Sequence, residues 1–209
     1  MKTATIYVHG LWLNGAEFAL MRRRIAARHG FEGFRFTYRT VGALEDSVAR
    51  LAQFVENIPA DRIHFVAHSL GGLLLTRFFE RAVDVPAGRV VFLGSPTVGS
   101  ATAKRVARVP LLGPLLGRTV TDELVNDCDA RAWRADRELG CIAGTRPMGL
   151  GRLFSRFDEA SDGTVAVRET RIPGHTAHLT LPVSHTGMLL STRVADQVGA
   201  FLASGRFDD

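Results

Sequence analysis

The sequence contains little cysteine, little lysine and no long apolar run. Its two cysteines, Cys128 and Cys141, form neither a metal-ligand spacing nor a disulfide framework, so we interpret them as two buried thiols. The only lysines are Lys2 and Lys104, so the net charge of +5 is carried almost entirely by arginine. No segment approaches the unbroken run of about 18 apolar residues that a membrane-spanning helix requires.

The pattern also lacks a secretory signal and a nucleic-acid-binding surface. Residues 1–4 lead directly into the strand-like run 6–8, without the apolar region and cleavage site of a signal peptide. We therefore expect a cytoplasmic protein. The arginines are scattered apart from a run at 22–24, and aromatic residues do not interleave with them. This distribution predicts a solvated basic surface and no nucleic-acid partner.

The order of apolar patterns predicts one α/β domain over residues 1–209. A chain of 209 residues that is 46% apolar and 22% charged can build a single sizeable core. Short β-rich runs alternate with longer stretches of helical periodicity, which is typical of parallel strands joined by crossover helices. The predicted strands are 3–8, 34–38, 62–67, 89–93, 139–144 and 178–183, and the predicted helices are 17–29, 44–58, 73–83 and 187–202.

Residues 97–137 fit this alternation least well. They hold a helix-like piece at 101–109, followed by the turn-rich apolar stretch 110–117. The pattern leaves two alternatives open, a partial lid or pocket wall and a loop packed on the core. The apolar residues 111–116 also raise the alternative of a weak contact with a membrane surface, with arginines facing anionic headgroups.

The strongest functional signal is the string Ala67-His68-Ser69-Leu70-Gly71. A serine hydroxyl is a weak nucleophile and must be presented beside a base, which a sharp turn from strand to helix achieves. Small residues flank such a serine because the backbone passes close to itself there. An apolar strand precedes this string and a helix-forming run follows it, so we predict Ser69 as a nucleophile. The alternative is a serine that only caps a helix.

A second signal, Val8-His9-Gly10-Leu11, ends the first predicted strand. Acyl transfer develops an oxyanion that needs two preorganised N–H donors. We predict the N–H of Leu11 and the N–H of Leu70 as this oxyanion hole, with His9 holding the loop. The alternative is an ordinary turn between a strand and a helix.

The general base should follow the nucleophile in the chain, with the acid between them. Of the later histidines, His185 lies after the predicted strand 178–183, on the sheet edge that carries the nucleophile turn, and we predict it as the base. His175 and His178 lie before or within that strand and should point elsewhere. A metal site built from His175, His178 and His185 is a weaker alternative, because no acidic partner is spaced to complete it.

The predicted acid is Asp162, in the turn Ser161-Asp162-Gly163. An Asp-Gly turn projects a short carboxylate, which would fix the imidazole tautomer and stabilise the imidazolium formed during attack. Asp158 and Glu159 are close competitors, and an ordinary solvated turn is the alternative. Chemistry of this kind requires no metal and no organic cofactor.

Together these motifs resemble the α/β hydrolase superfamily, and within it the small bacterial lipases without a large lid, of the Bacillus lipase A type. The stretch 94–100 is also similar to lipase-like and inositol-deacylase-like members. The resemblance covers about residues 6–202, departs from the usual pattern in having Ala67 for glycine, and is least good over 97–137. It implies a minimal α/β hydrolase fold, a mostly parallel sheet of about six strands with helices on both faces, and hydrolysis of carboxylic esters.

The sequence leaves several functions open beside an esterase or lipase acting on a small-molecule or lipid ester. The same three residues would serve a thioesterase or an acyltransferase. A catalytically silent binding protein could share the fold, although such relatives usually lack one of the three residues, and here all three have candidates. The sequence carries no signal for the oligomeric state.

Overall fold

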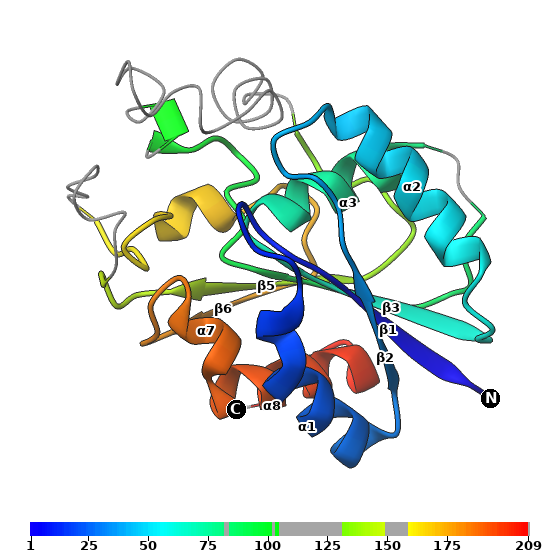
Figure 1. Cartoon of the computed structure of the whole chain (residues 1–209). Coiled ribbons are helices and arrows are strands. Elements are labelled where there is room, and N and C mark those ends of the chain that lie inside the picture. Colours follow the sequence, from blue (N-terminus) through cyan, green and yellow to red (C-terminus); the bar gives the residue numbers. More distant parts are fainter. Residues whose placement is uncertain (82–83, 102, 105–130, 149–158, 209) are drawn as a thin grey trace.

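The computed structural model describes residues 1–81, 84–101, 103–104, 131–148 and 159–208. Its centre is a six-stranded sheet in the order β2-β1-β3-β4-β5-β6 (Figure 1). Most of the segment 97–137, which fits the predicted alternation least well, lies outside the described residues, as do the apolar stretch 111–116, Cys128 and Asp158.

All six strands run parallel, and each corresponds to a predicted strand. Strand β1 pairs with β2 on one side and with β3 on the other. The chain therefore changes the direction in which it adds strands to the sheet, and this reversal lies between β1 and β3. Ligands of open parallel sheets bind at the carboxyl ends of the strands beside such a reversal. The strands are β1 Thr3–Val8, β2 Glu32–Phe36, β3 Arg62–His68, β4 Val90–Leu93, β5 Leu139–Gly144 and β6 Ala177–Leu181.

Helices cover both faces of the sheet, as predicted (Figure 1). The pair α2 and α3 packs on one face, and α1 packs with α7 and α8 on the other. Arg24 and Arg28 of α1 both bind the carboxylate of Asp196 in α8, so part of the arginine-rich surface joins two helices. The α-helices with described bounds are α1 Ala19–His29, α2 Leu44–Glu56, α3 Leu70–Glu80, α7 Gly187–Leu190 and α8 Thr192–Ser204, with 3₁₀ turns η1 Ala16–Phe18 and η3 Val167–Thr170.

Two predicted helices differ most from the structure, each for a local reason. Helix α3 begins at Leu70 rather than at residue 73, because the chain enters it directly from the turn at Ser69. The closing helix is divided at Ser191, which has extended backbone angles and whose side chain accepts the N–H of Val194 at 3.3 Å. A serine that caps a new helix in this way starts α8 as a separate element.

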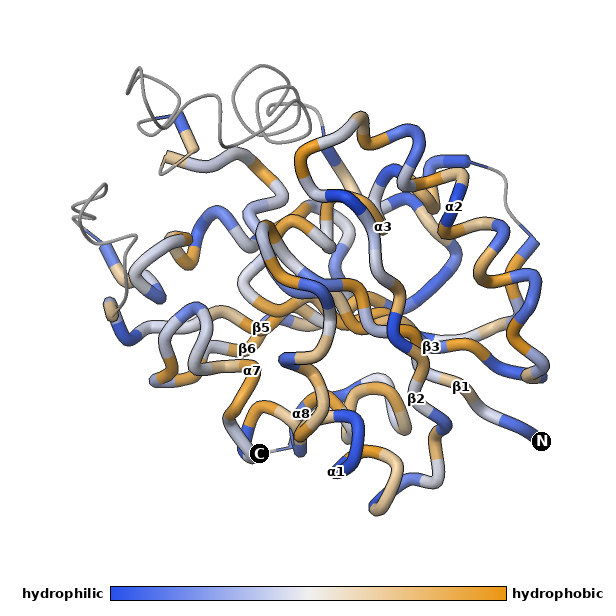
Figure 2. The backbone as a smooth tube through the Cα atoms, in the orientation of Figure 1, coloured by the Kyte–Doolittle hydropathy of each residue, from blue (hydrophilic) through white to orange (hydrophobic). Residues whose placement is uncertain are grey.

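The core lies on both faces of the sheet, so the central strands are buried along almost their whole length and are mostly apolar (Figure 2). On β3, Phe65 packs with the cluster under α2 and α3, whereas its neighbour Val66 packs with the cluster against α1 and α8. Phe92 and Val91 divide in the same way on β4. Successive side chains of a strand point to opposite faces, and burial of both faces is characteristic of parallel sheets.

None of the helices in the described part of the chain is long and apolar enough to cross a membrane.

Candidate active site

The turn after β3 has the predicted arrangement, with a strand before Ser69 and a helix after it. Ser69 has a φ of 52°, which non-glycine residues rarely adopt. A Cβ atom on Gly71 would lie 2.5 Å from the carbonyl oxygen of Val8, so α3 starts almost in contact with the end of β1. This close approach explains the small residue two positions after the serine.

Asp162 and His185, predicted as acid and base, are in direct contact. The His185 Nδ1 lies 2.7 Å from the Asp162 Oδ2, and the His185 backbone N–H donates to the Asp162 carbonyl at 3.0 Å. The second carboxylate oxygen accepts the backbone N–H groups of Thr164 and Val165, and Asp162 is fully buried. A carboxylate fixed in this way requires a proton on His185 Nδ1, which leaves Nε2 free to accept one.

His68 also holds His185 in place, a role that no motif in the sequence indicates. Its Nε2 lies 3.0 Å from the His185 carbonyl oxygen, and the centres of the two rings are 4.6 Å apart. Burial lowers the pKa of His68 well below its usual value, and the nearby His185 acts in the same direction whenever its ring is protonated. His68 is therefore neutral and donates its Nε2 proton to the backbone of His185.

Two glycines allow Ser69 and the Asp162–His185 pair to lie close to the carboxyl ends of β1 and β4. A Cβ on Gly10, after β1, would lie 3.0 Å from the Ser69 Cβ. A Cβ on Gly94, after β4, would lie 3.0 Å from the Asp162 Oδ2 and 3.1 Å from the His185 Nδ1. Within the described residues, no hydrogen bond joins the Ser69 hydroxyl to His185. Such contacts are often long before substrate binds.

The predicted oxyanion loop is a tight turn over Gly10–Leu13, closed by a 3.3 Å hydrogen bond from the Leu13 N–H to the Gly10 carbonyl. Its third residue, Trp12, has a φ of 59°, and left-handed geometry costs a non-glycine residue roughly 1–2 kcal/mol. Leu70 is the first residue of α3, so its N–H has no acceptor within that helix. In the part of the chain that the structure describes, neither Leu11 N–H nor Leu70 N–H bonds to the protein.

His9 is buried beneath this turn and is tied to Tyr38. The two rings stack with centres 4.4 Å apart, the Tyr38 backbone N–H donates to His9 Nε2, and the Tyr38 hydroxyl donates to the His9 carbonyl. The His9 Nδ1 then donates to the Gly10 carbonyl at 2.9 Å. Burial lowers the pKa of His9, so it is held neutral. These contacts fit the predicted role of holding the loop.

The rival acids and bases have other contacts. Glu159 is exposed and forms an ion pair with Arg168 at 2.7 Å. The His178 ring lies 2.8 Å from the Thr170 hydroxyl, and the His175 ring contacts a backbone carbonyl. Among the described residues, no group of three or more histidine, cysteine, aspartate or glutamate side chains could hold a metal ion.

Glu169 links two loops of the site, another role without a signal in the sequence. Its buried carboxylate accepts the backbone N–H of Ala101 at 2.7 Å and that of Ala166 at 2.9 Å. Burial raises the pKa of Glu169, while these two hydrogen bonds act in the opposite direction. The carboxylate therefore fixes the loop that follows β4 to the turn that carries Asp162.

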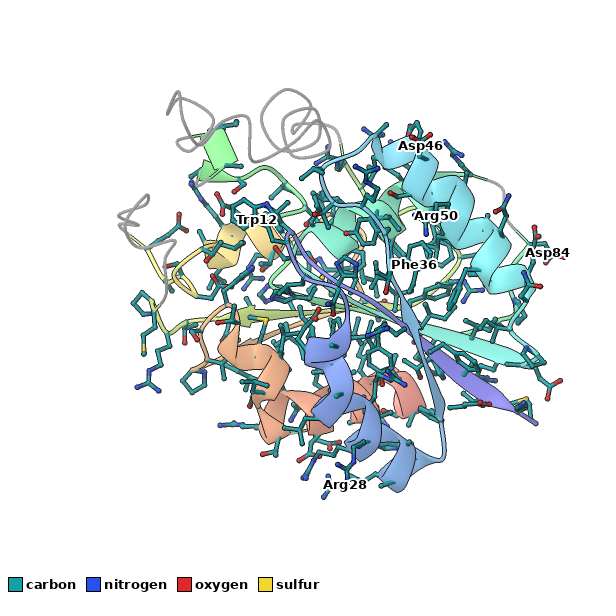
Figure 3. The ribbon with its side chains drawn as sticks, in the orientation of Figure 1. Trp12, Arg28, Phe36, Asp46, Arg50 and Asp84 are labelled. Carbon is teal, nitrogen blue, oxygen red and sulfur yellow. The ribbon has the colours of Figure 1, made fainter. Side chains whose placement is uncertain are left out.

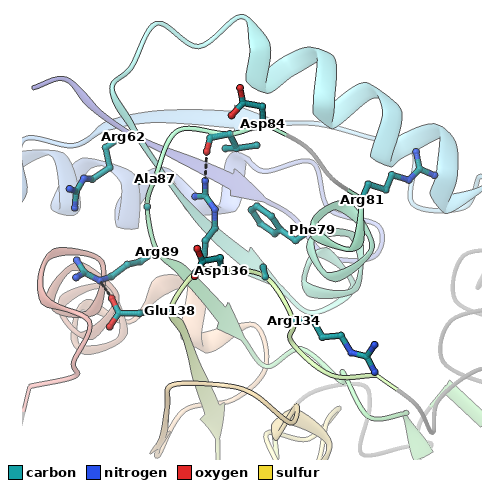
Figure 4. A pocket seen from close by; sticks show the side chains of 13 residues that line it. Arg62, Phe79, Arg81, Asp84, Ala87, Arg89, Arg134, Asp136 and Glu138 are labelled. Carbon is teal, nitrogen blue, oxygen red and sulfur yellow. Dashed lines mark hydrogen bonds and ion pairs between the residues drawn. The ribbon is translucent and has the colours of Figure 1, made fainter.

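A cavity of about 640 Å³ lies at the amino ends of β3, β4 and β5, opposite the strand ends that carry Ser69 (Figure 4). Two of its arginines, Arg89 and Arg137, already serve the fold. Arg137 donates to the carbonyls of Ile63, Val85 and Pro86 and lies over the Phe79 ring, and Arg89 forms an ion pair with Glu138. This cavity is therefore separate from the residues predicted to act in catalysis.

The buried His64 should make the protein less stable in mild acid. His64 is 1% exposed, and burial, reinforced by nearby arginines, lowers its pKa to about 3. Below about pH 6.5 the unfolded chain binds a proton that the folded chain rejects, so stability falls as the pH falls. From pH 7 to pH 5, His64 alone should reduce the free energy of unfolding by roughly 2 kcal/mol. Urea unfolding at the two pH values measures this loss.

The matched control for this prediction is His64→Gln, which has no titrating group at that position. Between pH 7 and pH 5 its free energy of unfolding should fall less than that of the wild type, because unfolding of the variant takes up about one proton fewer. Equal slopes for the two proteins would contradict the assignment to His64.

Comparisons with known proteins agree with this fold. The sequence matches the model of the alpha/beta hydrolase family over residues 6–203. The chain therefore belongs to the α/β hydrolase family. A comparison with curated protein sequences gives no match.

Solved structures of the same fold include several hydrolases at low sequence identity. A pyrethroid hydrolase from Sphingobium faniae JZ-2 superposes with a TM-score of 0.64 at 14% identity, with 98% of each chain covered. Carboxylesterase CesB from Bacillus subtilis gives 0.61 at 12% identity, covering 98% of this chain and 84% of that one. The RedJ thioesterase from Streptomyces coelicolor gives 0.59 at 13% identity, covering 97% and 85%. At such identities these likenesses concern the fold.

Proposed function

We propose that this protein is a serine hydrolase that cleaves carboxylic esters, with Ser69 as nucleophile, His185 as base and Asp162 as the group that orients the base. The observation that carries the proposal is the buried Asp162–His185 hydrogen bond of 2.7 Å, at the sheet edge that also carries Ser69. A buried carboxylate that orients an imidazole beside a serine on a strained turn is the arrangement that activates a hydroxyl.

The proposed cycle begins when His185 Nε2 takes the proton of Ser69 as the serine oxygen attacks the ester carbonyl. The carbonyl oxygen becomes an oxyanion, held by the N–H groups of Leu11 and Leu70, each worth about 3 kcal/mol by analogy with other oxyanion holes. His185 then gives its proton to the departing alcohol. Water, activated by the same base, releases the acid and restores Ser69.

Two features of the described residues support these roles. The positive φ of Ser69 is an outlier of the kind that accumulates at active sites. The backbone N–H groups of Leu11 and Leu70 are not used by the fold in the described part of the chain, so they remain available to an oxyanion. The fold is shared with a carboxylesterase, a pyrethroid hydrolase and a thioesterase.

Covalent labelling tests the proposal directly. A fluorophosphonate probe should add to the folded protein once per chain, and peptide mass spectrometry should locate the adduct on Ser69. Heat-denatured protein should not react, because labelling requires the assembled base. No labelling, or an adduct on another serine, would contradict the proposal.

Turnover of matched oxygen and sulfur esters then defines the reaction class. We expect measurable hydrolysis of p-nitrophenyl esters, and the corresponding acyl thioesters should be cleaved no faster. A large preference for thioesters would instead identify a thioesterase that uses the same residues.

A further inference from the structure

Trp12 combines a strained backbone with an exposed side chain. Among the described residues other than glycine, only Trp12 and Ser69 have a positive φ. Trp12 occupies the third position of the turn over Gly10–Leu13, where a positive φ usually selects glycine or asparagine. It is 65% exposed, so core packing does not account for a tryptophan at this position.

The turn that carries Trp12 lies against the proposed nucleophile. Gly10, which opens the turn, approaches the Ser69 side chain so closely that an added Cβ would lie 3.0 Å from the Ser69 Cβ. Figure 3 shows Trp12 on the loop after β1, at the end of that strand far from the N-terminus. The backbone N–H of Trp12 donates to the Thr40 hydroxyl at 3.3 Å. Val41, which follows Thr40 in the chain, is 43% exposed. Two exposed apolar side chains therefore belong to adjoining loops beside the site.

A strained backbone persists where the surrounding structure enforces it and function uses it. Glycine would supply this turn without strain, whereas tryptophan adds an exposed indole to the loop beside Ser69. An indole is a large, rigid and mostly apolar surface, and it suits the recognition of an apolar group.

From this geometry we propose that Trp12 binds the apolar part of an ester substrate and thereby sets its chain-length preference. The inference rests on the proposed function, because it places the substrate at Ser69. The apolar part is either the acyl chain or the alcohol, and both offer the indole the same chemistry.

Two substitutions separate binding by the indole from the geometry of the turn. Trp12→Ala removes the indole and keeps the left-handed strain, whereas Trp12→Gly removes both. Both variants should lower kcat/KM for octyl-chain esters by about 10-fold more than for acetyl esters of small alcohols. The glycine variant should unfold at an equal or higher temperature than the alanine variant. Leu20→Ala, which truncates another exposed apolar side chain on α1, should change none of these values.

Two substrate series identify the part of the ester that is bound. p-Nitrophenyl esters from acetate to octanoate vary the acyl chain, and acetates of methanol to octanol vary the alcohol. A loss that grows with chain length in either series supports the proposal and names the part. A loss that is equal for all substrates, or recovery of full activity in Trp12→Gly, would overturn it.

A measurement without turnover keeps this inference separate from the proposed function. In the Ser69→Ala protein, 2-octanone should shift the emission of Trp12, and acetone at equal concentration should not. Trp133 is only 7% exposed and serves as the internal background, which a Trp12→Phe version of the same protein isolates. Absence of a shift that depends on chain length would overturn the role of Trp12. A failure of fluorophosphonate labelling, with the shift present, would count against the esterase proposal alone.

Discussion

Ser69→Ala should reduce ester hydrolysis by at least about 10⁴-fold in kcat while leaving the fold intact. Loss of the nucleophile in hydrolases with this chemistry costs nearly as much as loss of all three acting residues, because they work as a unit. Alanine keeps the Cβ atom that lies against Gly10, so the packing of the two turns is preserved. Initial rates with p-nitrophenyl esters, together with the thermal unfolding midpoint, measure the two parts of this expectation.

Ser95→Ala is the matched control for this experiment. Ser95 is a buried serine that follows β4 and faces α3, and its hydroxyl has no hydrogen-bond partner among the described residues. Removal of this hydroxyl should leave kcat within a few-fold of the wild-type value. More than a few per cent of wild-type hydrolysis in purified Ser69→Ala protein would refute the assignment of the nucleophile.

Asp162→Asn should lower kcat by about 10⁴-fold, although the side chain keeps its shape. The asparagine oxygen can still accept the N–H groups of Thr164 and Val165, so the turn is retained. The amide N–H₂ then faces His185 Nδ1, which must become the acceptor and transfer the imidazole proton to Nε2. In that tautomer His185 cannot take the serine proton. Kinetics give the loss, and ¹⁵N NMR of the imidazole reports the tautomer.

Glu159→Gln provides the control for the loss of a carboxylate. Glu159 is three residues from Asp162 in the sequence but is exposed and paired with Arg168, so its replacement should leave kcat near the wild-type value. If the glutamine variant were the inactive one, and Asp162→Asn the active one, Glu159 would be the acid and Asp162 only a turn residue.

The sheet could be predicted from the sequence because its signal is local. Runs such as Thr3–Val8 and Leu139–Gly144 are short, carry no charged residue and are rich in apolar residues, as expected of strands buried on both faces, and the observed bounds agree with the predicted ones. Helix starts were less predictable. The sequence around Leu70 contains two glycines, which disfavour a helix. The contacts that explain them, of Gly71 with the end of β1 and of Gly72 with Ser95, are visible only in three dimensions.

Ser69, His185 and Asp162, the proposed nucleophile, base and acid, were singled out from short motifs and chain order, whereas the groups that hold them were not. His68 was part of the motif around Ser69, but its partner is the backbone of His185, 117 residues away in the sequence. Glu169 likewise acts on the backbone of Ala101. A bond from a side chain to a distant backbone group places no requirement on the identity of the second residue, so it leaves no pattern to read.

Gly10 and Gly94 also limit how the protein could be re-engineered. The ends of β1 and β4 lie so close to Ser69, Asp162 and His185 that no larger residue fits at either glycine without moving main chain or reacting groups. Point substitutions at these two glycines should therefore disrupt the proposed site. Directed evolution toward new substrates should accumulate its changes in the exposed loops around the site, at positions such as 12 and 41, and leave Gly10 and Gly94 unchanged.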